Sequence, residues 1–220
     1  MARTSTARRL EEAPFAPANR LEFGGGDPPA PPVRPNTPIA NNAWLATVMF
    51  LGAEAMFFAG LIGAFIVFRM GSPIWPPPFQ PRLPVGITGV NTIVLLASAI
   101  TMHMALRAVR AGAIDRAKRM LAVTAALGGV FLLIQGYEWA RLIHFGLTVS
   151  SSIYGGLFYT LIGFHAFHVA GALVWLIVVF VRANRGYLSR QRYIGLQVCA
   201  MYWTFVVALW PILYGLVYLY

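Results

Sequence analysis

The chain has 220 residues, of which 58% are hydrophobic and only 11% are charged, and its formal net charge is +10 at pH 7. This composition is typical of membrane proteins and excludes an ordinary soluble globular domain. The single cysteine, Cys199, excludes a disulfide framework or a thiolate metal cluster within the chain.

Residues 1–40 differ in composition from the rest of the chain. They contain eight prolines, five arginines and four acidic residues. No apolar core of a signal peptide is present in them, so we expect a Pro/Arg-rich cytoplasmic tail that is disordered on its own. Residues 41–220 are predicted to form one transmembrane domain.

Five apolar stretches are each long enough to cross a bilayer, which takes roughly 20 residues per helix. Backbone groups in lipid must hydrogen-bond within the protein, and the stretches are continuously apolar, so we expect helices rather than a barrel. The predicted fold class is an all-α integral membrane protein with five transmembrane helices. The expected spans are about 44–68, 86–107, 118–144, 154–181 and 193–219.

The distribution of basic residues predicts the orientation of these spans. Fourteen of the 17 lysines and arginines fall in the tail and in the connections after the second and fourth spans. Only Arg69, Arg82 and Arg141 fall on the other side. The positive-inside rule therefore predicts a cytoplasmic N-terminus and an external C-terminus. The same distribution accounts for the positive net charge, because basic residues at the cytoplasmic face contact anionic lipid. No nucleic-acid partner is therefore expected.

Glu54 is the only charged residue of the first span. Ionisable residues within membrane helices are costly, which makes them candidates for function. Two interpretations stay open, a structural carboxyl bonded to a neighbouring helix and a role in proton transfer, lipid binding or gating. Beside Glu54, the small residues Ala55, Ala59 and Gly63 recur at a spacing suited to close helix contact.

The third span contains the second carboxylate at membrane depth, Glu138, near its outer end. Arg141 follows three residues later, within reach of an ion pair on the same helix face. The adjacent Tyr137 and Trp139 are typical of the aromatic belt at a membrane interface. The pattern favours a structural anchor at that interface.

Histidines in the second and fourth spans raise the alternative of a metal or haem site. His165 and His168 share one face of the fourth span, and His103 lies in the second. A metal site needs three or four ligands, and this spacing does not define such a set, even with Glu54. Neutral histidines bonded between packed helices are the favoured interpretation.

The fifth span is rich in large aromatic residues, including Trp203, Trp210 and Tyr214. Their position near the C-terminus favours an outer interfacial belt. No nucleotide-binding loop, Ser/His/Asp set or paired-carboxylate motif occurs in the sequence, so no catalytic centre is evident in this chain.

Several motifs occur in an order that resembles subunit III of the haem–copper terminal oxidases, the cytochrome c oxidase subunit 3 family. The matching segments are FLGAEAMFFAGLIGAF (50–65), WPPP (75–78), GVNTIVLLASAITMHMA (89–105), LIQGYEW (133–139), SSIYGGLFYTLIGFHAFHV (151–169) and YWTFVVALW (202–210). Together they cover about residues 44–220. The chain resembles the five-helix form of the family, which lacks the first two helices of the seven-helix form.

The resemblance implies a non-catalytic subunit that carries no metal or haem itself. Its main partner would be subunit I, whose haem and copper reduce oxygen to water with proton pumping. Subunit II and small subunits would complete the complex, and cytochrome c would act on it as electron donor. The resemblance also implies phospholipid bound in a cleft and support of proton uptake by subunit I. The usage of Arg, Ala, Gly and Pro and the absence of a targeting peptide favour a bacterial plasma membrane.

The same resemblance assigns roles to single residues. Glu54 matches the family's membrane-buried glutamate, near the lipid cleft and the contact with subunit I. Arg182 matches an arginine near a lipid phosphate, which agrees with its expected position at the inner interface. His165 and His168 match a signature of the packed interior. His103 and Glu138 are expected to be structural polar residues.

One departure from the family pattern leaves the subfamily open. Thr204 and Val207 stand in the last helix where relatives usually have His and Asp. A subunit III-like component of a quinol oxidase or nitric oxide reductase is therefore an alternative. The remaining alternative is a stand-alone proton channel or transporter that uses Glu54.

Overall fold

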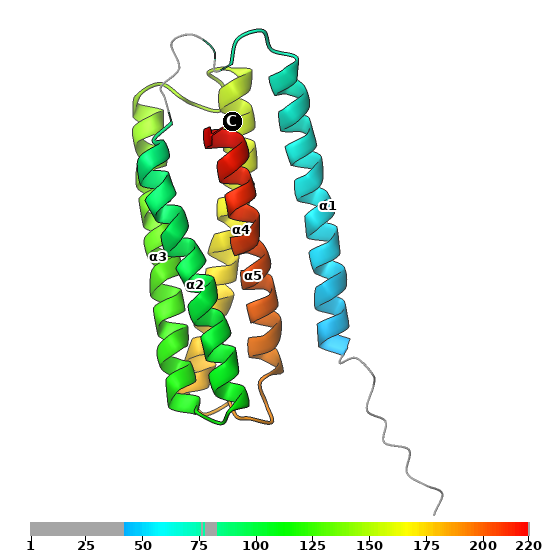
Figure 1. Ribbon diagram of the computed structural model, residues 1–220, viewed down its shortest axis with the longest axis vertical. Helices are drawn as coiled ribbons and strands as arrows, with labels where there is room; N and C mark the ends of the chain where they lie inside the picture. Colours follow the sequence, from blue (N-terminus) through cyan, green and yellow to red (C-terminus); the bar gives the residue numbers. More distant parts are fainter. Residues whose placement is uncertain (1–41, 76, 78–82, 220) are drawn as a thin grey trace, which may run out of the picture. The chain divides into compact units, whose positions relative to one another are not determined.

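The computed structural model describes residues 42–75, 77 and 83–219. The predicted tail, residues 1–40, lies outside them. The described residues form five long helices and no strand apart from an isolated bridge between Ser189 and Arg192, which confirms the all-α prediction. The helices are α1 (Asn42–Met70), α2 (Val85–Arg110), α3 (Ile114–His144), α4 (Ile153–Asn184) and α5 (Ile194–Tyr214), and the π-helical turn η1 (Gly215–Leu219) follows α5 (Figure 1).

All five helices are long and apolar enough to cross a membrane. Three of them end at a glycine in the left-handed region, Gly112 after α2 (φ 81°), Gly146 after α3 (φ 89°) and Gly186 after α4 (φ 83°). After each glycine the next amide donates back to a carbonyl of the last turn, as Ala113 N does to Ala108 O at 2.9 Å. Glycine adopts this conformation without the steric cost of a Cβ, so it ends the helix and reverses the chain.

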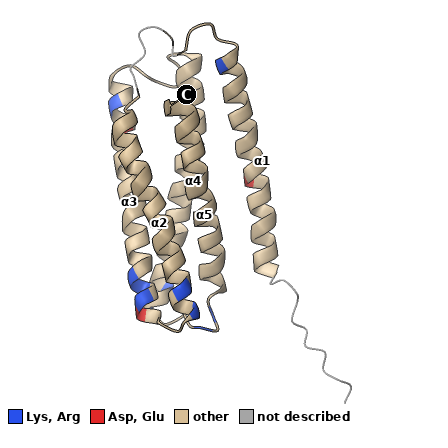
Figure 2. Cartoon of the chain, viewed as in Figure 1, with Lys and Arg blue, Asp and Glu red and all other residues tan. Residues whose placement is uncertain are grey.

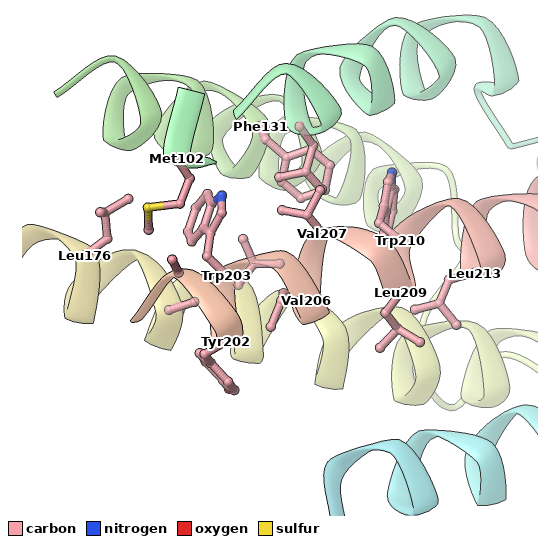
Figure 3. Packing of buried hydrophobic residues seen from close by; sticks show 14 of the residues in the cluster. Met102, Phe131, Leu176, Tyr202, Trp203, Val206, Val207, Leu209, Trp210 and Leu213 are labelled. Atoms are coloured by element: carbon pink, nitrogen blue, oxygen red, sulfur yellow. The ribbon is translucent and has the colours of Figure 1, made fainter. Parts of the chain in front are cut away.

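The core of the bundle lies between α2, α3, α4 and α5. The contact between α2 and α3 is the most extensive, and α5 packs against α1, α2 and α4. The indoles of Trp203 and Trp210 are 1% and 0% exposed and lie among the side chains of the core (Figure 3). Their N–H groups donate to hydroxyls of α2, at 3.1 Å to Ser98 Oγ and 2.8 Å to Thr92 Oγ1.

The expectation of an outer aromatic belt is therefore wrong for Trp203 and Trp210. Both rings face inward, because hydroxyl groups on a neighbouring helix satisfy the one polar group that each indole carries. The whole ring can then be buried, and large aromatic area fills the centre of the bundle.

Helix α1 is the least buried of the five. Only Phe58 and Phe65 are buried among its residues, and it makes its main contacts with α4 and α5. The small residues Ala55, Ala59 and Gly63 are exposed. The close helix contact expected of them is not made within the described part of this chain.

Candidate functional site

The structure brings Glu54 of α1 against His168 of α4. Glu54 Oε2 lies 2.8 Å from His168 Nε2, and the two side chains are 16% and 14% exposed. The approach is short, but its angle departs from that of a good hydrogen bond. Each residue had been singled out in the sequence, whereas their pairing had not. The contact links α1, which has few other neighbours, to the rest of the bundle.

The other ring nitrogen of His168 has a partner on its own helix. His168 Nδ1 lies 2.6 Å from the carbonyl oxygen of Phe164. A carbonyl only accepts hydrogen bonds, so Nδ1 carries a hydrogen and Nε2 of a neutral ring has a lone pair. Nε2, the nitrogen that faces Glu54 Oε2, is then the position at which the neutral ring can accept a hydrogen bond.

Aromatic rings surround the pair. The ring of His168 lies 5.1 Å from that of Phe58 and 6.2 Å from that of Phe57. Phe57 also packs edge-on against Phe164 at 5.2 Å. These apolar rings lower the local dielectric constant, so the Glu54–His168 contact is stronger than it would be in water.

His165 and His103 have other partners than this pair. His165 is fully buried and stacks on Trp210 with ring centroids 5.0 Å apart. His103 is exposed on α2, and its Nδ1 lies 2.8 Å from Ala99 O of the preceding turn. Within the ranges that the structure describes, no three His, Cys, Asp or Glu side chains come together in a way that could hold a metal ion. The described residues thus offer no ligand set for the metal alternative.

Glu138 points into the bundle rather than to the membrane interface. Its side chain is 3% exposed, while the neighbouring Tyr137 is 64% exposed. Arg141 Nη1 lies 3.7 Å from Glu138 Oε1, and the arginine side chain is 47% exposed. Inside the bundle, Gln135 lies one turn before Glu138 and is also buried. The spacing of these two residues, three apart in an apolar span, is a sequence signal for a polar helix face.

Arg182 lines a pocket of about 520 Å³ between the end of α4, the start of α5 and their connection. Its guanidinium lies 5.7 Å from the ring centroid of Tyr187. Trp175, Val178 and Val179, one to two turns earlier in α4, line the same pocket. A cation beside an apolar wall is an arrangement that suits an anionic group attached to a hydrocarbon chain.

Among the residues that the structure describes, the two that depart from the family pattern make no polar contact with another helix. The Thr204 hydroxyl donates to Ala200 O of its own helix at 2.7 Å. Val207 is 2% exposed and packs in the apolar core (Figure 3). Thr204 and His103 line a second pocket, of about 380 Å³, between α1, α2 and α5.

Charged residues are distributed unevenly along the helices (Figure 2). Most lysines and arginines of the described residues lie at or near the α2–α3 and α4–α5 connections. At the opposite helix ends, the described basic residues are Arg69 and Arg141. The uneven distribution of basic residues along the sequence thus corresponds to a difference in positive charge between the two ends of the helices.

Comparisons with known proteins agree with one another. The family model described as "Cytochrome c oxidase subunit III" matches residues 36–220. The chain is 35% identical over 173 residues to "Cytochrome c oxidase subunit 3" of Synechocystis sp., covering 78% of this chain and 73% of that protein. It is 33% identical over 180 residues to "Probable cytochrome c oxidase subunit 3" of Nocardia farcinica, covering 81% and 88%. The subunit 3 of Bacillus subtilis is 32% identical over 179 residues, covering 81% and 86%.

Proposed function

Since the chain belongs to the cytochrome c oxidase subunit III family and is a subunit III of a haem–copper oxidase, we propose that it stabilises subunit I, binds phospholipid and supports proton uptake. It is a membrane protein that assembles with other oxidase subunits. The observation that carries the proposal is the family match over residues 36–220 of a chain with five membrane-spanning helices. Subunit I supplies the haem and copper in this proposal, and subunit II and small subunits are further partners.

We propose α1 as the surface that contacts subunit I. Most of its large apolar side chains are exposed, and Gly52, Gly60 and Gly63 have no heavy atom within 4 Å of an added Cβ. Small residues with open space beside them allow the backbone of another membrane helix to approach closely. The Glu54–His168 contact would then hold α1 in the position that the partner requires, so Glu54 acts in positioning rather than in acid–base catalysis.

The assignment is tested by purifying the tagged chain from its native membrane in mild detergent. We expect a haem–copper subunit I to co-purify with it and the reduced-minus-oxidised spectrum to contain haem bands. Mass spectrometry of the same sample identifies the accompanying subunits. A chain that is recovered alone and colourless would contradict the proposed function and favour the transporter alternative for Glu54.

The haem types and the electron donor of the co-purified complex also distinguish the subfamilies. We propose cytochrome c as the donor, as the names of the relatives suggest. The alternative of a quinol oxidase or nitric oxide reductase rests on Thr204 and Val207, which lack the polar pair of typical relatives. Oxidation of reduced cytochrome c by the purified complex, compared with oxidation of a quinol, decides between these donors.

Replacing Arg182 with glutamine is expected to lower the amount of anionic phospholipid that stays with the purified complex. Arg182 is one of two arginines that line this pocket with an apolar wall, the other being Arg192, and removing its charge weakens the attraction for a lipid phosphate. Phospholipid retained per haem is the measurement. Arg185→Gln is the matched control, because Arg185 is near the same helix end but does not line the pocket. Equal phospholipid loss in both variants would contradict a specific site.

The same proposal includes the location and orientation. We infer a bacterial plasma membrane with the N-terminus in the cytoplasm and the C-terminus outside. The basic residues at the α2–α3 and α4–α5 connections support this orientation, since positive charge accumulates on the cytoplasmic side.

A further inference from the structure

A group of buried polar side chains lies where α2, α3 and η1 meet, at the helix ends away from the basic connections. Asn91 of α2 is 1% exposed, and Gln135 and Glu138 of α3 are 2% and 3% exposed. Tyr218 of η1 is 8% exposed. The role in the oxidase proposed above uses none of these residues. Buried polar groups are costly unless they are paired, so their concentration in one region requires an explanation.

Two hydrogen bonds bring these side chains to one place. Asn91 Nδ2 donates to the carbonyl oxygen of Phe131 at 3.1 Å, one helical turn before Gln135. Gln135 Nε2 donates to the phenol oxygen of Tyr218 at 3.3 Å. Glu138 lies three residues after Gln135, on the same face of α3. The side chains of Asn91, Gln135 and Glu138 therefore converge on the face of α3 that packs against α2 and η1.

The π-helical turn contributes to this arrangement. Tyr218 stacks on Tyr214 with ring centroids 5.5 Å apart, and its phenol reaches Gln135 inside the bundle. A π-helical turn changes the direction of the side chains that follow an α-helix, and such turns are frequent at functional sites. The turn thus adds a third helical element to the group.

On Asn91, Gln135 and Glu138, the buried atoms that lack a hydrogen-bond partner among the described residues are oxygen acceptors. The amide nitrogens of Asn91 and Gln135 are used in the two hydrogen bonds, which turns their oxygens away from those partners. Among the described residues, no donor reaches Asn91 Oδ1, Gln135 Oε1 or Glu138 Oε1. The guanidinium of Arg141 is 3.7 Å from Glu138 Oε1, beyond hydrogen-bond distance, and is half exposed.

We propose that this face binds one monovalent hard cation, with Na⁺ as the ion that fits its chemistry. Hard cations take carboxylate, amide and hydroxyl oxygens as ligands, and the unpartnered atoms of Asn91, Gln135 and Glu138 are amide and carboxylate oxygens. Glu138 supplies a single buried carboxylate, and the guanidinium of Arg141, half exposed and 3.7 Å away, compensates its charge only in part. One additional positive charge is therefore better accommodated here than two. The oxygens of Asn91, Gln135, Glu138 and Tyr218 are the proposed ligands.

The direct test is equilibrium binding of radioactive sodium to the purified oxidase complex. The complex is prepared in choline chloride, equilibrated with ²²NaCl and separated rapidly from free ions. We expect saturable binding that exceeds that of a complex with Glu138→Gln by one equivalent. Glu54→Gln is the matched control, because it removes the other membrane carboxylate and should leave the sodium uptake unchanged. Equal uptake by wild type and Glu138→Gln would overturn the proposal.

A second measurement covers the case in which Glu138→Gln does not assemble. Gln135→Met keeps a similar shape and removes the amide oxygen, and it should lower the sodium affinity of an intact complex. In the wild-type complex, NaCl should raise the temperature at which the subunit is released, relative to choline chloride at equal ionic strength. A release temperature that follows pH and not Na⁺ would overturn the cation proposal and assign a proton to Glu138. Unchanged sodium affinity in Gln135→Met would also contradict it.

Discussion

Replacing Glu54 with lysine is expected to remove most of the subunit from the purified oxidase. A cation in the middle of a membrane helix costs about 3 kcal/mol or more. In this chain it would also lie against His168 Nε2, which is 2.8 Å from the present carboxyl group. Because His168 Nδ1 already carries a hydrogen bonded to Phe164 O, the ring cannot offer a negative partner. The ratio of this subunit to haem in the purified complex measures the loss.

The matched control is Glu54→Gln. Its amide group is neutral, has nearly the same shape and can donate an N–H to His168 Nε2, so the packing of α1 on α4 is kept. We expect this variant to preserve assembly and most of the oxygen reduction. A complete loss of oxidase activity in an assembled Glu54→Gln complex would show that the carboxyl group takes part in the chemistry, and it would contradict the positioning role.

Replacing Gly128 with leucine is expected to destabilise the bundle by about 3 kcal/mol, at the upper end of the usual cost of overpacking. A Cβ at Gly128 would lie 2.5 Å from Cη2 and 2.9 Å from Cζ2 of Trp203. The indole cannot easily move away, since it is 1% exposed and its N–H donates to Ser98 Oγ at 3.1 Å. The midpoint of thermal or denaturant-induced unfolding in detergent measures the effect.

The neighbouring Gly129 provides the control for this prediction. No heavy atom lies within 4 Å of a Cβ built on Gly129. Gly129→Leu makes the same change in helix propensity on the same helix, so the difference between the two variants isolates the clash with Trp203. Equal unfolding midpoints for both variants would show that Trp203 is not packed as described.

The five membrane helices could be predicted from the sequence because the bilayer leaves so few alternatives. A continuous apolar stretch in lipid must satisfy its own backbone hydrogen bonds, and a helix does so within one segment. The residues at which the helices begin and end could be predicted less well, because hydropathy marks the apolar segment and not the whole helix. For example, α3 begins at Ile114, four residues before the predicted span, and continues through the basic residues of its first turns.

The sequence by itself thus determined the class of protein, the number of helices, the family resemblance and the identity of the unusual polar residues, Glu54 and Glu138 among them. Only the tertiary structure decided which residues meet. Apolar composition does not distinguish a side chain that faces lipid from one that faces another helix, which is why Trp203 and Trp210 were expected at an interface and are buried in the core. The pairing of Glu54 with His168 and the convergence of Asn91 with Gln135 depend on helix packing, because residues distant in the chain become neighbours only when the helices associate.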